Sequence, residues 1–185
     1  MTEFNQNKYL HNLFAVPTKI QVPAADRKLL ERERLHVEWK PHLSNVVLLS
    51  AGAGAGKTML ARQLAKRWRG SVAWYTIDRS ENEPALFAQY LVAAIKDAHP
   101  GVIALSIHVD SDKGLDSFFS ALLAQLDTME PLLLVLDDLH LITNSDILRG
   151  LKYFIAHLPR HINILLSTRT VPKVGIASLR VRGRL

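Results

Sequence analysis

A glycine-rich stretch directly after an apolar run constrains this chain more than any other feature of its sequence. Positions 50 to 60 read SAGAGAGKTML, and the run NVVLL precedes them. A phosphate-binding loop follows the pattern Gly, four residues, then Gly-Lys-Ser/Thr, between a strand and a helix. Gly56, Lys57 and Thr58 match the end of that pattern, whereas Ala51 stands where its first glycine is expected. Because alanine adds only a methyl group and fits if its φ is negative, we still predict a phosphate-binding loop.

A dinucleotide-binding loop is the alternative for a stretch so rich in glycine. Its GxGxxG pattern would begin at Gly52 and require glycine at position 57, where Lys57 stands, so the sequence excludes it. A triphosphate instead needs several N–H groups from a loop of little side-chain bulk, followed by the positive end of a helix. We expect these nucleotide contacts from one continuous stretch of residues: Ala53, Gly54, Ala55, Gly56, Lys57, Thr58 and Met59.

Apolar runs and helical periodicities alternate along the rest of the chain. We predict buried strands over 45–50, 71–78, 131–138 and 161–169. Helices are expected over 57–69, from Pro84 with Asn82 as its cap, from Asp116 as a cap, and over 145–158. Strands that are apolar throughout are covered on both faces, which is typical of parallel sheets. The fold class is therefore α/β, a P-loop NTPase-type three-layer sandwich whose mostly parallel sheet has about five strands, the fifth starting within GIASLRVRGRL (175–185).

The first 44 residues form a separate segment in this interpretation. Positions 1–25 show little periodicity and contain Pro17 and Pro23, which indicates an extended arm. Positions 26–40 combine dense charges with spaced leucines, which is typical of a surface helix, and Pro41 ends it. We accordingly divide the chain into an arm with a first helix, 1–44, and a core, 45–185.

Two adjacent aspartates follow the most apolar predicted strand. LLLVLDD places Asp137 and Asp138 at its carboxyl end, where the side chains of parallel strands point into a crevice shared with the loop. We predict that Asp137 holds Mg²⁺ together with the hydroxyl of Thr58, and that Asp138 polarises the attacking water as a general base. Aspartates also cap turns, so this prediction depends on the loop.

Other polar residues lie near the same predicted edge. Thr168 or Arg169 is a candidate sensor of the γ-phosphate, with an ordinary surface arginine as the alternative. His140 either links the aspartates to the loop or is a hydrogen-bonded structural histidine. Asp78 binds a metal-bound water or merely shapes a turn.

Composition and charge limit the kinds of partner, metal and location that we expect for this chain. The net charge is +6, but the excess is concentrated at Lys66, Arg67 and Arg69 and at Arg180, Arg182 and Arg184. No aromatic residue is interleaved with the terminal arginines, which favours solvated faces over nucleic-acid contact. No cysteine is present and the eight histidines are scattered along the chain, so no structural zinc is expected. The N-terminus lacks the pattern of a secretory signal and no long apolar run occurs, which predicts a cytoplasmic location.

Several blocks of the sequence resemble a known family. They are TKI (18–20), LLSAGAGAGKTML, VAWYTIDRSENEPALFAQYL, LVLDDLHLI, NILLSTRTVP and GIASLRVRGRL. In this order they resemble the signal-transduction ATPases with numerous domains (STAND), in the MalT-like branch of LuxR-type transcriptional activators. That family also commonly carries alanine at the first loop position.

The resemblance implies a regulatory switch that binds ATP or ADP with Mg²⁺, hydrolyses ATP slowly and self-associates. It implies Lys57, Asp138 and Arg169 as catalytic residues and Thr58 and Asp137 as metal ligands. It also implies Arg27 or Lys28 as the nearest equivalent of a basic pair that contacts nucleotide. The family's winged-helix, sensor and DNA-binding domains are expected beyond Leu185, so DNA contact is expected only through a domain outside this sequence. Two alternatives stay open: a P-loop ATPase or kinase whose purpose is turnover, and an interaction domain that has lost nucleotide.

Overall fold

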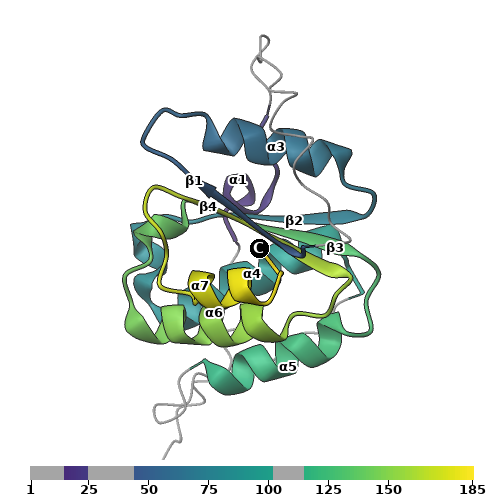
Figure 1. The fold of residues 1–185 in the computed structure, drawn as a ribbon. Coiled ribbons are helices and arrows are strands. Elements are labelled where there is room, and N and C mark those ends of the chain that lie inside the picture. Colours follow the sequence, from purple (N-terminus) through teal and green to yellow (C-terminus); the bar gives the residue numbers. More distant parts are fainter. Residues whose placement is uncertain (1–14, 25–43, 102–114) are drawn as a thin grey trace, which may run out of the picture.

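The computed structural model describes residues 15–24, 44–101 and 115–185, and its centre is a four-stranded parallel sheet (Figure 1). The strands are β1 (Val46–Ser50), β2 (Ser71–Thr76), β3 (Leu132–Asp137) and β4 (Ile162–Thr168). Their order across the sheet is β1-β4-β3-β2, and every neighbouring pair is parallel. All four carboxyl ends therefore lie at one edge, where the loop after β1 meets the aspartates after β3.

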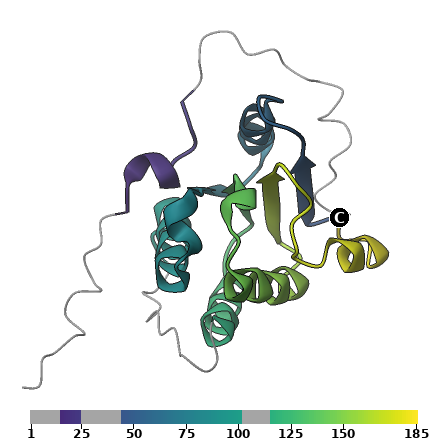
Figure 2. The ribbon, with the colours of Figure 1, turned by 90° about the vertical axis from the view of Figure 1, so that its left-hand side faces the viewer.

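Helices cover both faces of this sheet, which makes three layers (Figures 1 and 2). On one face lies α3 (Lys57–Arg67), and the opposite face carries α4 (Pro84–Ala98), α6 (Ser145–His157) and α7 (Ile176–Val181). Helix α5 (Asp116–Leu126) packs against α6. The short elements are α1 (Pro17–Ile20), η2 (Arg79–Asn82) and η3 (Leu139–Leu141).

Each face of the sheet has its own apolar core, as the continuous apolar runs require. Alternate residues point to opposite faces of a strand, so Leu134 contributes to the core under α4 and α6 while Leu133 and Val135 contribute to the core under α3. All six residues of β3 and all seven of β4 are buried. The predicted α/β class, the four strands and the helices that flank them are confirmed.

The expected fifth strand is wrong among the described residues, because the segment from Ile176 to Val181 is helix α7. Its apolar residues fit the apolar–polar alternation of a strand in the sequence. In the structure, however, Ile176 and Leu179 are three residues apart and face the core, while Val181 is 89% exposed. That is helical spacing. Gly175 precedes the helix with φ +80°, a conformation that glycine adopts without strain.

Two predicted helix caps and part of the predicted arm are also corrected. Glu83, not Asn82, caps α4, since its carboxylate accepts hydrogen bonds from the N–H groups of Ala85 and Leu86. Asp116 is the first residue of α5 rather than its cap. Part of the arm predicted as extended forms one helical turn, α1.

The helix predicted over 26–40, with Arg27, lies outside the described residues, and the division at residue 44 stays a prediction. Within the described ranges, no helix has the length and hydropathy needed to cross a membrane.

Candidate functional site

The loop between β1 and α3 has the backbone geometry that its glycines allow. Gly54 and Gly56 have φ of +71° and +80°, in the left-handed region, and Gly56 is the N-cap of α3. In the described part of the chain, Asp138 is the one non-glycine residue with positive φ, so Ala51 has the negative φ that an alanine requires. The first turn of α3 contains no acidic residue, which leaves its positive end uncompensated. This geometry suits an anion.

The lysine of the loop is folded back over the loop's own entrance. Its ammonium donates hydrogen bonds to the carbonyl oxygens of Ala51 and Gly52, each at 2.9 Å. These neutral acceptors hold Lys57 beside the position that an anion would take at the N-terminus of α3. A phosphate oxygen is a stronger acceptor than either carbonyl, because both partners of that bond are charged.

A hydrogen bond joins the loop to the aspartates. Thr58 Oγ1 donates to Asp137 Oδ2 at 2.8 Å, from the first turn of α3 to the end of β3. The carboxylate of Asp137 is buried, and its other oxygen accepts the N–H of Asp138 at 3.1 Å. The structure therefore brings together the two residues predicted to hold a metal.

Asp138 has an unusual backbone. Its φ and ψ are 60° and 35°, and it begins the short helix η3. A non-glycine residue in this region costs about 1–3 kcal/mol and persists where surrounding contacts over-determine it, which is common at functional sites. Its side chain is 34% exposed, so water reaches the carboxylate.

His140 lies against Asp138 without bonding to it. Its Nδ1 is 3.6 Å from Asp138 Oδ1, too long for a hydrogen bond. Burial lowers the pKa of His140, and the positive charges of Arg169 and Lys57 lower it further against the opposing effect of the Asp138 and Asp137 carboxylates. The ring is therefore neutral at pH 7, and its electrostatic neighbours are those predicted for the site.

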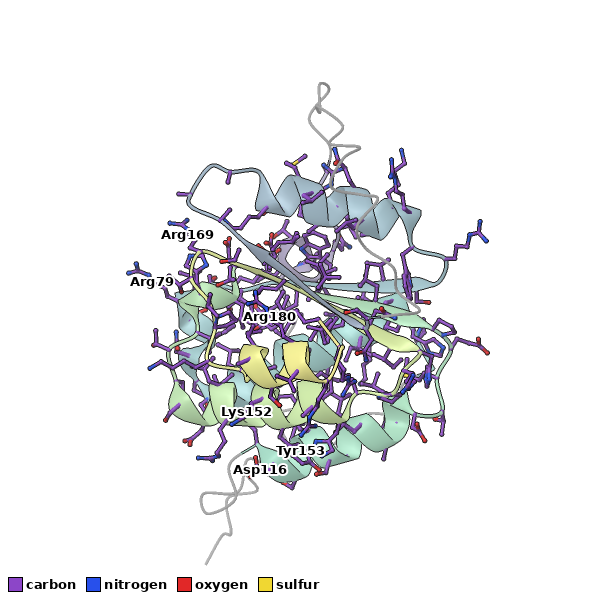
Figure 3. All side chains as sticks on the ribbon, viewed as in Figure 1. Arg79, Asp116, Lys152, Tyr153, Arg169 and Arg180 are labelled. Carbon is purple, nitrogen blue, oxygen red and sulfur yellow. The ribbon has the colours of Figure 1, made fainter. Side chains whose placement is uncertain are left out.

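The remaining candidates differ in placement. Arg169 is exposed on the loop after β4, on the same side of the molecule as Arg79 of η2 (Figure 3). Thr168 is buried and its hydroxyl donates to the carbonyl of Thr170 at 2.6 Å. The carboxylate of Asp78 caps η2 and pairs with Lys19, which matches the turn role rather than metal binding. The loop residues Ala53 and Ala55 lie between β1 and α3, and Met59 lies in the first turn of α3.

Three polar residues have surroundings or contacts that their local sequence does not predict. Ser167 of β4 is fully buried, its hydroxyl has no partner among the described residues, and it follows Leu166, which pairs with Leu136 next to Asp137. The sequence signal for Ser167 is a serine inside an apolar run. Lys19 and Asn82 make contacts with residues far along the chain, which no local pattern indicates.

The donor set at Thr58 and Asp137 fits Mg²⁺ better than a structural metal. In the part of the chain described here, no three His, Cys, Asp or Glu side chains gather in the way a protein-only site needs. Mg²⁺ usually binds through one or two protein oxygens and completes its shell with phosphate and water. One hydroxyl and one carboxylate, already within 2.8 Å of each other, provide such a pair.

Comparison with known proteins agrees with this geometry. The AAA domain family matches residues 42–169. The chain is 38% identical over 176 residues to the HTH-type transcriptional regulator MalT of Serratia proteamaculans (strain 568) and to that of Yersinia enterocolitica serotype O:8, and 35% identical over 175 residues to that of Yersinia pestis (strain Pestoides F). These alignments cover 92% of this chain but 19% of each relative. The chain therefore belongs to the AAA-domain family, as a P-loop domain similar to that of the MalT regulators.

Proposed function

We propose that this chain is the ATP-binding switch domain of a MalT-like transcriptional regulator, with slow hydrolysis coupled to self-association. The observation that carries the proposal is the hydrogen bond between Thr58 and Asp137. It joins the predicted phosphate-binding loop to the aspartates at the carboxyl end of β3. The similarity to proteins named as transcriptional regulators supports the regulatory purpose.

Binding uses the loop and the start of α3. The N–H groups of the loop and first helical turn donate hydrogen bonds to the phosphate oxygens. The Lys57 ammonium leaves the carbonyl oxygens of Ala51 and Gly52 and donates to the phosphate oxygens instead. Thr58 and Asp137 hold Mg²⁺, which when bound offsets the charge of the polyphosphate. Arg27 is proposed to lie near the nucleotide as well, on the resemblance alone.

Hydrolysis uses the residues after β3 and β4. Asp138, partly exposed and fixed by its strained backbone, accepts a proton from the attacking water. Arg169 pairs with the γ-phosphate from the loop after β4, which requires its exposed side chain to turn toward the loop. ATP carries the γ-phosphate that Lys57 and Arg169 contact and ADP lacks it, so this contact distinguishes the two nucleotides.

The whole regulator's properties belong to this proposal too. Self-association and DNA binding through a domain outside this sequence are inferred from the resemblance, and a cytoplasmic location is inferred from the sequence pattern of the N-terminus. The charge clusters of this chain contribute no operator contact of their own.

Titration with ATP and ADP in the presence of Mg²⁺, followed by a turnover assay, tests the function. The Asp138→Asn variant should retain nucleotide affinity and lose about 10²-fold in turnover, since a positioned general base contributes at least that much. The exposed Asp127 at the end of α5 offers the control Asp127→Asn, which should match the unaltered protein. Turnover above about 1 s⁻¹ without a partner would instead indicate an enzyme whose purpose is turnover, and the absence of any heat of nucleotide binding would indicate an interaction domain.

A further inference from the structure

A series of polar contacts leads from the N-terminal helix α1 toward the aspartates. Lys19 of α1 pairs with Glu81, a residue of η2, at 2.5 Å and with Asp78, the N-cap of η2. The Glu81 side chain is fully buried, and the Lys19 ammonium also lies 5.0 Å from the centre of the Tyr90 ring in α4. Figure 2 shows α1 beside α4, at the end of the sheet formed by β2. A buried carboxylate needs its cation, so this contact ties α1 to η2.

The last residue of η2 connects this cluster to the segment after η3. The Asn82 side-chain amide donates to the carbonyl of Leu141 at 2.8 Å, and its oxygen accepts the N–H groups of Thr143 at 2.7 Å and Asn144 at 3.0 Å. The side chain of Asn144 in turn donates to the carbonyl of Asn82 at 3.0 Å. With the bond that the Thr143 hydroxyl donates to the Asn82 side-chain oxygen at 3.2 Å, five hydrogen bonds join two segments about sixty residues apart.

The segment that Asn82 holds is the one that fixes Asp138. The N–H of Leu141 donates to the carbonyl of Asp138 at 3.0 Å, which closes the turn of η3. The carbonyl of the same Leu141 accepts the Asn82 amide. Leu141 is therefore held at both of its backbone groups, one by Asp138 and one by Asn82.

We propose that Asn82 is a positioning residue for Asp138, and that the Lys19–Glu81 contact supports it, so that hydrolysis depends on the seating of α1. The proposal rests on the proposed function, since it assumes that Asp138 acts on water. The physical reason is the left-handed backbone of Asp138, which persists only where surrounding contacts over-determine it. Without the Asn82 amide, η3 keeps its internal bond but loses its attachment to η2, and the carboxylate of Asp138 samples a wider range of positions.

The experiment compares nucleotide affinity with turnover in the full chain. The Asn82→Ala variant should bind ATP within about twofold of the unaltered protein and lose about tenfold or more in kcat, because displacement of a catalytic group by 1 Å is enough for such a loss. Asn82→Asp keeps an oxygen for Thr143 and Asn144 but removes the donor to Leu141, so it should lose turnover while retaining the fold. Amide hydrogen exchange at Thr143 and Asn144 should quicken in Asn82→Ala, because this substitution removes the acceptor of both N–H groups, and this readout is independent of activity.

Glu83→Ala is the matched control. Glu83 is the neighbour of Asn82 and caps α4 with two hydrogen bonds of its own, none of which reaches η3. This variant loses the two hydrogen bonds that cap α4 and should keep both affinity and turnover. If Asn82→Ala and Asn82→Asp turn over as fast as Glu83→Ala, the positioning role is overturned.

Double variants separate this proposal from the proposed function. Asn82→Ala added to Asp138→Asn should cause no further loss of turnover, and Lys19→Met added to Asn82→Ala should likewise add nothing, since each pair acts through one group. Additive losses of turnover would overturn the proposed dependence of Asp138 on Asn82 and Lys19. If Asp138→Asn alone turns over like the unaltered protein, the proposed function fails and this inference with it. If Asp138→Asn is slow and Asn82→Ala is not, only the inference fails.

Discussion

Lys57 is the residue whose charge the proposed site needs most directly. Its ammonium is held at the loop entrance by two carbonyls, and no carboxylate of the described residues bonds to it, so the ammonium is available to a phosphate. Lys57→Ala should weaken ATP binding at least tenfold, because a hydrogen bond to a charged group contributes about 1.5–3 kcal/mol. Calorimetric titration measures this. The exposed Lys66 of the same helix offers the control Lys66→Ala, and equal affinities in both variants would remove Lys57 from the site.

The carboxylate of Asp78 makes the free energy of unfolding depend on pH in the acid range. Hydrogen bonds from Lys19 and Ser80 hold the pKa of Asp78 well below its ordinary value, outweighing its burial. A lowered pKa contributes stability that is present above about pH 3.9, the pKa of an unfolded aspartate, and is lost as the pH falls below it. Because this side chain is half exposed, the contribution should stay below about 1 kcal/mol.

Thermal unfolding between pH 6 and pH 3 checks that dependence. The difference in Tm between the unaltered protein and Asp78→Asn should narrow as the pH falls through about 4. A difference that stays constant over this range would show that the carboxylate makes no pH-dependent contribution.

At the scale of elements, the packing of α5 on α6 depends on a glycine. A Cβ at Gly150 would lie 2.6 Å and 2.8 Å from two carbon atoms of the Phe119 ring. Gly150→Ala should therefore destabilise the protein by about 1–3 kcal/mol through overpacking, reduced by the better helix propensity of alanine. Urea unfolding measures the change. Phe119→Leu should cost less in the Gly150→Ala background than alone, and simple additivity of the two would count against the clash.

The elements themselves could be predicted from the sequence wherever a period was long enough. The runs that form β3 and β4 are recognisable in the sequence because most of their residues are apolar and both faces are covered. The segment at Ile176 was not, because three apolar positions over six residues fit either period, and the contact of Leu179 with the core decides between them. Asn82 was assigned to a cap because asparagine commonly caps helices, yet its side chain bonds to a segment far along the chain.

At the scale of the whole molecule, Arg184 joins segments from three parts of the chain. Its guanidinium donates to the side-chain oxygen of Asn45 at 3.0 Å and to the carbonyls of Ala156 at 2.6 Å and Leu158 at 2.8 Å. Its own carbonyl accepts the N–H of Val46 at 2.9 Å. The start of β1 and the end of α6 are thereby held by one residue.

Arg184→Ala should lower the free energy of unfolding by about 1–3 kcal/mol, because three partly buried acceptors lose a charged donor. Urea unfolding monitored by circular dichroism measures the loss. Arg182→Ala removes an exposed arginine two residues away and should leave stability within about 0.5 kcal/mol of the unaltered protein. Equal effects of the two substitutions would indicate a general effect of charge rather than these contacts.

The sequence by itself determined the four strands from β1 to β4, the longer helices between them and the chemistry of the loop, because periodicity, glycine conformation and the Gly-Lys-Thr spacing are properties of neighbouring residues. Only the tertiary structure decided which distant residues meet. Thr58 and Asp137 are 79 residues apart, and Lys19 and Glu81 are 62 apart. Such pairs form because the sheet order β1-β4-β3-β2 brings the carboxyl ends of all four strands to one edge, and that order depends on the packing of two cores rather than on any local pattern.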